Sequence, residues 1–371
     1  MSWSARLTRW GFTPFDLLLF AVPVAIALRY VEAWYNATLL FVTAALAIVP
    51  LAGWMGRATE QLAARSGAGV GGFLNATFGN AAELIIGLVA LSKGLTGVVK
   101  ASITGSIIGN LLLVLGVSIL AGGLRYPHQT FNQTAARISA TSLGLGAIAL
   151  LIPTIFHRSA ELRGGWTAAG EQRLSLAIVI VLFVTYFFSL LFHLVTHRDL
   201  LGALLQKETD AEKLWPLWQS ITALAIATAL IAWLSEFLVG SIEAARHSLG
   251  LTELFVGVVI VALVGNAAEH STAVWMAWKN EMDLSLSIAT GSSLQMALFV
   301  TPVLVFSSYA FGDPMTLEFS LPEIAAIVLS VWIVGQISGD GESNWLEGVQ
   351  LLSVYVITGI LFYFLPAPSI H

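Results

Sequence analysis

The pentapeptide Gly-Asn-Ala-Ala-Glu occurs twice in the chain, at 79–83 and again at 265–269, each time within a long apolar segment. The two copies place Glu83 and Glu269 near the middle of those segments. A carboxylate at the centre of a membrane helix costs roughly 2.5–3.5 kcal/mol on insertion scales, so one that persists usually faces a pathway, a partner or an ion. The repeated glutamates therefore predict one shared cation site.

Other oxygen-bearing side chains share helix faces with these glutamates. Thr77 and Asn80 precede Glu83 at three-residue steps, and Asn75 and Gly79 precede it at four-residue steps, which places them on one helical face. The same reasoning predicts further path-lining residues on the following segment and in the second copy: Ser102, Ser106, Asn110, Asn266, Ser292 and Gln295. For Ser102, Ser106, Asn110 and Ser292 the alternative is ordinary packing between membrane helices.

The predicted ligands are all oxygen atoms, which suit a hard cation such as Ca²⁺ with about 6–8 ligands in irregular geometry. The absence of cysteine and the scarcity of histidine in the apolar segments argue against copper or zinc at this site. Gly79 and Gly265 are predicted hinges, at which a helix could break and release main-chain carbonyls. Because a carboxylate binds either a metal or a proton, Ca²⁺ and H⁺ would compete for the two glutamates.

The two copies differ in the residue that follows the glutamate. His270 follows Glu269, whereas Leu84 follows Glu83. An imidazole beside a carboxylate can tune proton release, and it can equally be a packing group hydrogen-bonded to a neighbouring helix. Both interpretations of His270 stay open from the sequence.

The elements that must position these residues are membrane helices. The 371 residues are 57% hydrophobic and 11% charged, far too apolar for a soluble domain. Eleven runs are long enough to cross a hydrocarbon core of about 30 Å: 14–31, 35–55, 71–92, 97–121, 138–156, 173–195, 217–239, 253–278, 284–308, 320–337 and 346–365. The first has no small-residue cleavage site after it and is predicted to be an uncleaved helix. No basic run suits nucleic acid.

The repeat extends beyond the pentapeptide. An offset of 186 residues gives fourteen identities over 70–115 without a gap, including Lys93 with Lys279 and Thr104-Gly105-Ser106 with Thr290-Gly291-Ser292. The copies begin in the third and eighth predicted spans, and this odd separation makes them cross the membrane in opposite directions. Inverted repeats of this kind are typical of secondary transporters with a site at the membrane midplane.

These observations divide the chain into four parts. They are a first helix (1–34), a first five-helix repeat (35–196), a short acidic connection (197–215) and a second five-helix repeat (216–371). Ten of the seventeen basic residues fall on the N-terminal side of the predicted membrane, which favours a cytoplasmic N-terminus and an external C-terminus.

The segment Gly71-Gly72-Phe73-Leu74-Asn75-Ala76-Thr77-Phe78 that leads into the first motif, together with the motif itself, closely resembles the first signature repeat of the calcium/proton antiporters, or cation exchangers. Gly265-Asn266-Ala267-Ala268-Glu269-His270 resembles their second repeat, and 105–106 and 291–295 resemble the companion helices. The similarity covers most of the chain. The four carboxylates in 197–213 make a shorter acidic connection than strong regulatory Ca²⁺ binding would need.

The resemblance implies an all-α integral membrane protein of about eleven transmembrane helices, one peripheral helix followed by two inverted five-helix halves, that exchanges Ca²⁺ for H⁺ by alternating access. It implies that Glu83 and Glu269 bind the metal and couple protons, with Asn80, Asn266, Ser106, Ser292 and Gln295 around them. The bacterial cytoplasmic membrane is the expected location, with an organellar membrane such as the vacuole as the alternative. The lipid bilayer and the transported ions are the expected partners, and no cofactor is expected.

Three other functions compete with this one. An exchanger of the same fold could use Na⁺ in place of H⁺ or carry Mn²⁺ in place of Ca²⁺. The resemblance of the Gly-Asn-Ala-Ala-Glu motif to the calcium/proton antiporters favours protons over sodium. A passive cation channel could also select ions with carboxylates, but repeats with glycine-broken helices favour alternating access. An enzyme is not expected, because the chain has no His-Glu-x-x-His motif and no obvious nucleophile near the deep glutamates.

Overall fold

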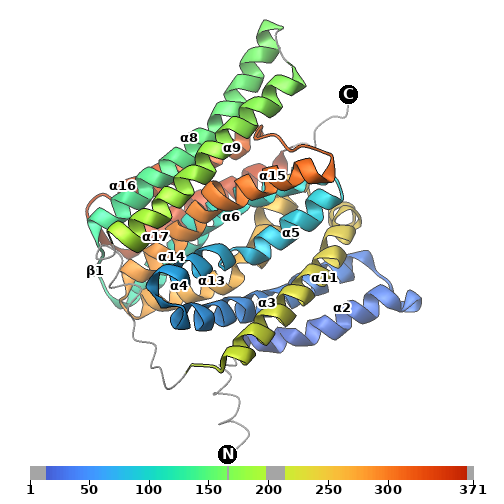
Figure 1. Cartoon of the computed structure of the whole chain (residues 1–371), viewed down its shortest axis with the longest axis horizontal. Helices are drawn as coiled ribbons and strands as arrows, with labels where there is room; N and C mark the ends of the chain where they lie inside the picture. The colour runs from blue at the N-terminus through green and yellow to red at the C-terminus, as the bar shows by residue number, and fades with distance from the viewer. Residues whose placement is uncertain (1–13, 165–166, 198–213, 366–371) are drawn as a thin grey trace, which may run out of the picture.

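Helices make up almost every element of the protein, as Figure 1 shows for a computed structural model that describes residues 14–164, 167–197 and 214–365. The described part of the first half contains η1 (Pro14–Phe20), α2 (Ala21–Tyr30), η2 (Glu32–Trp34), α3 (Ala37–Arg65), α4 (Gly67–Phe78), α5 (Ala81–Ser92), α6 (Thr96–Ile108), the π-helical η3 (Gly109–Val114), α7 (Leu115–Arg125), α8 (Gln133–Arg163), α9 (Ala168–Leu191) and the π-helical η4 (Phe192–Thr196).

The second half repeats this order of helices. It contains α11 (Leu217–Leu249), α12 (Glu253–Phe255), the π-helical η6 (Val256–Val261), α13 (Ala262–Trp278), α14 (Met282–Gln295), the π-helical η7 (Met296–Val300), α15 (Thr301–Phe311), α16 (Leu321–Ile337) and α17 (Trp345–Phe364). Side-chain caps begin several of these helices: Asn36 accepts the Leu39 N–H at the start of α3, and Asn344 forms a capping box with Glu347 at the start of α17. Residues 198–213, with the four predicted acidic residues of the connection, lie outside the described ranges.

All eleven predicted spans fall on these helices. Among the described residues, seven helices are long and apolar enough to cross a membrane alone, and a bent pair in the second repeat makes an eighth. The other three predicted spans are the η1–α2 segment, the interrupted pair α4–α5, and α16, which has 17 residues. The protein is therefore an all-α integral membrane protein, and the count of eleven stays a prediction.

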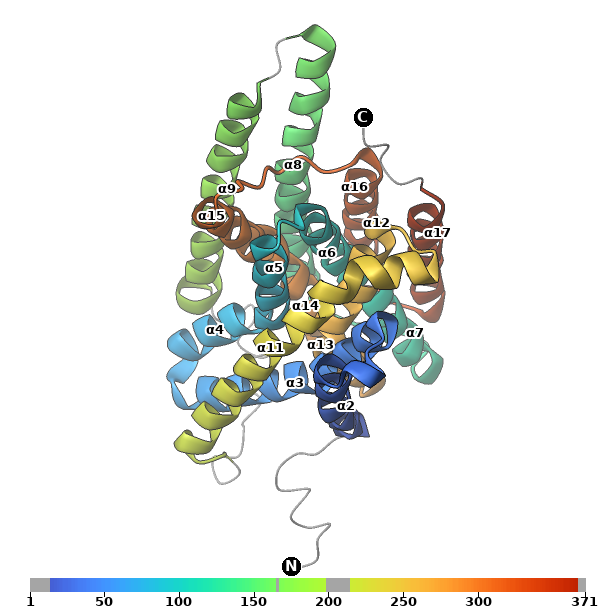
Figure 2. The same ribbon diagram turned by 90° about the vertical axis from the view of Figure 1, so that its right-hand side faces the viewer.

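The helices pack around the repeated motifs. Figures 1 and 2 show α5, α6, α13 and α14 in the middle, with α3, α11 and α2 together on one side and the hairpin of α8 and α9 projecting on the other. The only strands in the described residues, β1 (Gln129–Thr130) and β2 (Glu342–Ser343), pair antiparallel and join the connections before α8 and α17.

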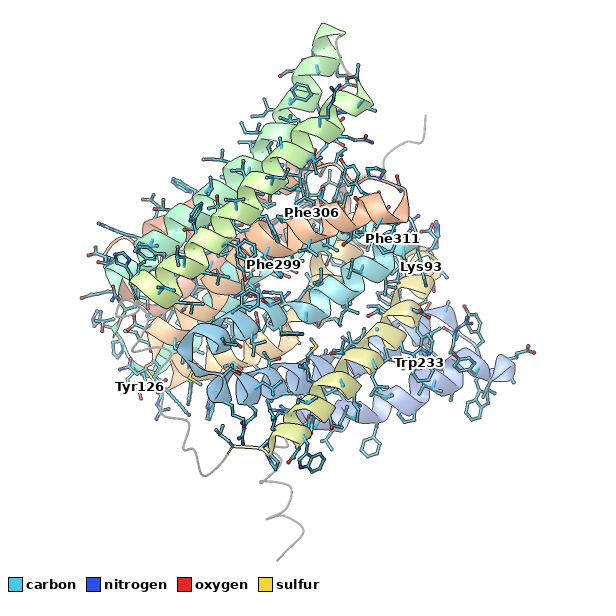
Figure 3. All side chains as sticks on the ribbon, viewed as in Figure 1. Lys93, Tyr126, Trp233, Phe299, Phe306 and Phe311 are labelled. Carbon is cyan, nitrogen blue, oxygen red and sulfur yellow. The ribbon has the colours of Figure 1, made fainter. Side chains whose placement is uncertain are left out.

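The outer surface carries large apolar side chains, as Figure 3 shows on the ribbon. Phe188, Trp218 and Trp332 are all more than 60% exposed. Such a surface suits lipid hydrocarbon, whereas soluble monomers rarely expose large contiguous apolar patches. Polar side chains that are buried inside the body instead cluster near the two motifs, among them Asn80, Asn110 and Asn266, each 1% exposed.

Candidate ion-binding site

The first copy of the motif lies at a break between two helices. α4 ends at Phe78, Gly79 and Asn80 form a turn, and α5 begins at Ala81. Glu83 therefore falls in the first turn of α5. Main-chain N–H groups are unpaired there and the helix dipole favours negative charge. Gly79 lies at the interruption, where the sequence predicts a hinge.

The second copy lies on a helix that bends without a turn. The segments Glu253–Ala267 and Glu269–Trp278 meet at an angle of 69°. The bend therefore lies within the second copy of the motif, and the hinge at Gly265 stays a prediction. The contacts of Gly265 give it a packing role as well.

Each motif glycine makes room for the glutamate of the other copy. A methyl group added at Gly265 would lie 2.8 Å from Cγ and 3.0 Å from Cδ of Glu83. A methyl group added at Gly79 would lie 2.9 Å from the main-chain oxygen of Asn75, 3.3 Å from Oε1 of Glu269 and 3.4 Å from Oε1 of Gln295. Contacts under 3.4 Å are tighter than ordinary van der Waals packing, so both positions need the missing Cβ of glycine. The two glutamates are thereby brought to the same place from opposite repeats.

A network of amides and hydroxyls adjoins the glutamates on the first-repeat side. Nδ2 of Asn80 donates to Oε1 of Gln295 at 2.6 Å, and Oγ of Ser292 donates to Oδ1 of Asn80 at 2.9 Å. Asn80 and Ser292 are both buried, whereas Gln295 is half-buried. The first copy of the motif is thus held by residues of α14, which belongs to the second repeat.

The network continues on the second-repeat side. Nδ2 of Asn266 donates to Oγ of Ser106 at 3.1 Å, and Nδ2 of Asn110 donates to Oδ1 of Asn266 at 3.2 Å and to Oγ of Ser292 at 2.9 Å. All four residues are buried. The second copy of the motif is held in turn by α6 and η3 of the first repeat.

The contacts between the two repeats are reciprocal. Asn80 pairs with Ser292, and the residues 186 positions away, Asn266 and Ser106, make the equivalent pair. The glycines and glutamates are related in the same way, since Gly265 lies against Glu83 and Gly79 lies against Glu269. A surface that contacts its own copy in this way is the mark of a two-fold relation. This reciprocity supports the predicted inversion and places both motifs in one site.

The carboxylates have unmatched oxygens inside this site. Glu83 is 5% exposed and Glu269 is half-buried. Oε2 of each is buried and has no hydrogen-bond partner among the described residues. A charged oxygen in that position is costly unless a cation or a proton satisfies it. The two atoms therefore point to an ion-binding role for the pair.

Three predicted lining residues stay outside the network in the described part of the chain. Thr77 donates from Oγ1 to the Phe73 carbonyl of its own helix, Asn75 is exposed, and Ser102 is half-buried without a hydrogen bond to the network. The ladder that grouped Asn75 and Thr77 with Glu83 assumed one continuous helix, and the turn after Phe78 breaks it.

Glu60, a charged neighbour of Glu269, was not predicted as part of the site. It lies on α3, is exposed, and is close enough to Glu269 to act on it electrostatically. From the sequence it is one of several acidic residues near span ends, and only the fold brings it to Glu269. Glu83 is buried, whereas Glu269 and Gln295 are half-buried and Glu60 is exposed.

His270 lies beside the site rather than in its hydrogen-bond network. Its Nε2 is buried without a partner among the described residues, so this nitrogen makes no hydrogen bond to a neighbouring helix there. The ring lines a small cavity with Ser106 and Asn266 and also a larger apolar cavity of about 770 Å³. His270 therefore separates the polar site from an apolar space.

Two π-helical turns lie at equivalent places in the repeats. η3 covers 109–114 and η7 covers 296–300, which is 110–114 shifted by 186. A π turn inserts an extra residue into the helical ladder and often marks a functional site. In η7, Thr301 Oγ1 donates to the Met296 carbonyl at 2.7 Å. Nothing in the residue types signals these turns, so sequence reasoning missed them.

Comparison with known proteins identifies the family of the chain. Residues 36–195 and 219–364 match the family described as sodium/calcium exchanger protein. The chain belongs to this family. The match covers both halves and leaves out only the ends and the connection between the halves.

Individual relatives of this exchanger family are similar over nearly their full length. A Ca(2+)/H(+) antiporter of Aphanothece halophytica is 47% identical over 365 residues, covering 95% of this chain and 96% of the relative. The Ca(2+)/H(+) antiporter ChaA of Bacillus subtilis is 45% identical over 354 residues, covering 95% and 99%. The solved structure of native YfkE has a TM-score of 0.82 at 42% identity, covering 95% of this chain and all of that one.

Proposed function

We propose that this exchanger carries Ca²⁺ in one direction and H⁺ in the other by alternating access, with Glu83 and Glu269 as the shared binding groups. The observation that carries the proposal is the pair of buried, unmatched Oε2 atoms, brought together from two repeats by reciprocal contacts. A carboxylate from each half lets one ion bind both halves at once. Movement of one half against the other would then change the side from which the ion is reached.

The chemistry of the surroundings favours a hard divalent cation. The groups around the carboxylates are amides and hydroxyls, from Asn80, Asn266, Ser106, Ser292 and Gln295. The chain contains no cysteine that could supply a thiolate ligand. Ca²⁺ accepts such mixed oxygen ligands in irregular geometry, whereas Mg²⁺ demands a regular octahedron and keeps more water. Ca²⁺ is thus the substrate that the donor set fits best.

Protons are the proposed counter-ion because the empty site is costly to leave charged. Two carboxylates held close together in a largely buried site repel each other, and water compensates their charge less than it would at a surface. Ca²⁺ neutralises both charges, and two protons do the same. The protein therefore changes its accessible side only when the site holds either the metal or protons. Exchange follows because the conformational change of the unoccupied, charged site is too costly.

The relatives support protons over sodium. Three relatives with 45–47% identity all carry the name Ca(2+)/H(+) antiporter. The family description itself covers sodium/calcium exchange, so an Na⁺-driven exchanger is the second candidate.

Purified protein in proteoliposomes tests the proposal. With a pH gradient imposed, radiolabelled Ca²⁺ uptake should follow the gradient and be accompanied by proton movement, while an Na⁺ gradient alone should drive no uptake. Uptake that follows Na⁺ and ignores pH would favour the second candidate, and uptake without any counter-ion movement would indicate a channel. Mn²⁺ in excess over Ca²⁺ measures the selectivity of the same site.

A further inference from the structure

The larger apolar cavity beside His270 lies between η1, α3, α7 and α13, and α13 packs against both α3 and α7 (Figure 2). Its volume of about 770 Å³ is within the range of about 300–1,000 Å³ that is usual for pockets that bury a small ligand. Apart from His270 and Ser271, the residues that line it are apolar or aromatic. Phe15, Leu46 and Trp275 among them are each more than 40% exposed, so the cavity opens at the outer surface.

Lipid hydrocarbon borders this opening, because α3 and the bent span that contains α13 both cross the membrane. An apolar cavity offers water no hydrogen-bond partners, so a hydrocarbon chain fills it more favourably than water does. From Trp278 to His270 the cavity follows eight residues of α13, about 12 Å at 1.5 Å per residue. Half of a hydrocarbon core of about 30 Å is about 15 Å. The cavity is therefore nearly as long as one leaflet of the membrane is deep.

Two cations lie at the end of the cavity that is lined by Trp275 and Trp278. The guanidinium of Arg125, the last residue of α7, lies 5.3 Å from the ring centre of Trp278 and donates from Nη1 to the Trp278 carbonyl at 3.2 Å. Nζ of Lys279, directly after α13, lies 5.0 Å from the ring centre of Trp275. Tryptophan and basic side chains gather at the level of the lipid headgroups. This end of the cavity is therefore where a headgroup would lie.

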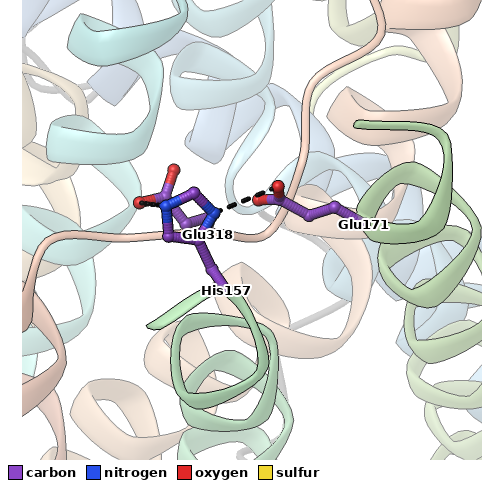
Figure 4. A group of neighbouring side chains, drawn as sticks. All are labelled: His157, Glu171 and Glu318. Carbon is purple, nitrogen blue, oxygen red and sulfur yellow. Dashed lines mark hydrogen bonds and ion pairs between the residues drawn. The ribbon is translucent and has the colours of Figure 1, made fainter. Parts of the chain in front are cut away.

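The two cations at the cavity differ from other ionisable side chains of the protein in having no carboxylate beside them. At the far end of α8, His157 lies 3.2 Å from Oε2 of Glu171 and 4.0 Å from Oε1 of Glu318 (Figure 4). On the same helix, Arg158 pairs at 3.5 Å with the exposed Glu161. Among the described residues, neither cation at the cavity takes part in an ion pair. Basic groups in this position attract an anionic headgroup.

The equivalent place in the first repeat lacks this arrangement. Lys93, 186 positions before Lys279, donates from Nζ to the main-chain carbonyl of Glu236 at 3.0 Å. The residues 186 positions before the two tryptophans are Val89 and Ser92. The two-fold relation of the ion-binding site therefore does not require the aromatic and basic end of α13, and these residues point to a separate role.

We propose that the apolar cavity binds one acyl chain of an anionic phospholipid, with the lipid phosphate held by Arg125 and Lys279. The chain would contact both arms of the 69° bend, because Val264 and Val274 both line the cavity. A lipid bound there would therefore stabilise this bent conformation. His270 lies between this lipid site and the candidate ion-binding site.

Native mass spectrometry of the delipidated, full-length protein in detergent tests the proposal. One phosphatidylglycerol should stay bound per chain, and phosphatidylcholine should bind at least about 10-fold more weakly. The double variant Arg125→Gln/Lys279→Gln should weaken phosphatidylglycerol binding at least about 10-fold, because the anionic headgroup loses both cations. Lys93→Gln, the equivalent substitution in the first repeat, should leave binding unchanged. Val274→Trp, which fills the cavity, should weaken the binding of both lipids.

Three results would overturn the proposal: equal binding of the two lipids, phosphatidylglycerol binding that is unchanged in the Arg125→Gln/Lys279→Gln variant, or binding that Val274→Trp leaves unchanged. Arg125 and Lys279 are exposed, so their variant keeps the test valid if Val274→Trp fails to fold. Phosphatidylglycerol should also raise the unfolding temperature of the unmodified protein, and no rise would contradict stabilisation of the bent conformation. Because none of these measurements uses transport, failure here is distinct from failure of Ca²⁺/H⁺ exchange.

Discussion

Glu83 and Glu269 belong to the same pentapeptide, yet they have different surroundings. Glu83 is buried, follows a break between two helices and precedes a leucine, whereas Glu269 is half-buried, follows a 69° bend and precedes a histidine. The scaffold around them is reciprocal, since each glutamate packs on the other copy's glycine. The two-fold relation therefore builds the site, while the neighbours of the two glutamates make them unequal in exposure.

The largest expected effect on transport comes from removing either carboxylate. Glu83→Gln and Glu269→Gln should each lower Ca²⁺ uptake by at least about 100-fold, because loss of a direct ligand exceeds the 10–100-fold cost of losing an outer partner. Vesicle uptake under a pH gradient measures this, with Glu161→Gln as the matched control. If one variant kept most of its transport, the two halves would not share one site.

A smaller loss is expected from filling the space that Gly265 leaves. Gly265→Ala should push the Glu83 side chain, whose Cγ would lie 2.8 Å from the new methyl group. A displacement of about 1 Å at a reacting group can cost on the order of 100-fold, and we expect a reduction of about 10- to 100-fold in uptake.

The matched control for that variant is Gly291→Ala, where no atom lies within 4 Å of the added methyl group. It should transport normally. Equal effects of the two substitutions would mean that the glycines act through helix flexibility and not through space for the opposite glutamate.

Replacing His270 by leucine makes the second copy match the first. His270→Leu should keep the fold, because Nε2 has no hydrogen-bond partner among the described residues. We expect a change of about 3- to 10-fold in initial rate and an altered dependence of the rate on pH, as for a neighbouring group that handles protons. An unchanged pH profile between pH 6 and 8.5 would identify His270 as a packing residue.

The smallest effects mark the boundary of the site. Asn75→Ala and Ser102→Ala should change uptake by less than about 2-fold, because neither side chain joins the network in the described structure. Asn80→Ala, which removes hydrogen bonds to Ser292 and Gln295, should reduce it at least about 10-fold. A strong loss in Asn75→Ala would extend the path along α4.

The sequence predicted the parts of the site that repetition makes visible. An identical motif at a fixed offset, in apolar segments of opposite direction, was enough to pair Glu83 with Glu269 and Asn80 with Asn266. The π turns and the position of Glu60 were not predictable, because they depend on packing between distant helices. The same holds for His157, Glu171 and Glu318, which no local spacing connects.

The interlock of glycine and glutamate has a consequence for how such a chain can arise. The same contact, a glutamate of one repeat against the motif glycine of the other, occurs twice in the site. Each half therefore carries both a glutamate that binds and a glycine that leaves space for the other glutamate. A half-length chain inserted in both directions would form this pair with a second copy of itself. Later substitutions, such as leucine to histidine after one of the two glutamates, could then give different roles to halves that began alike.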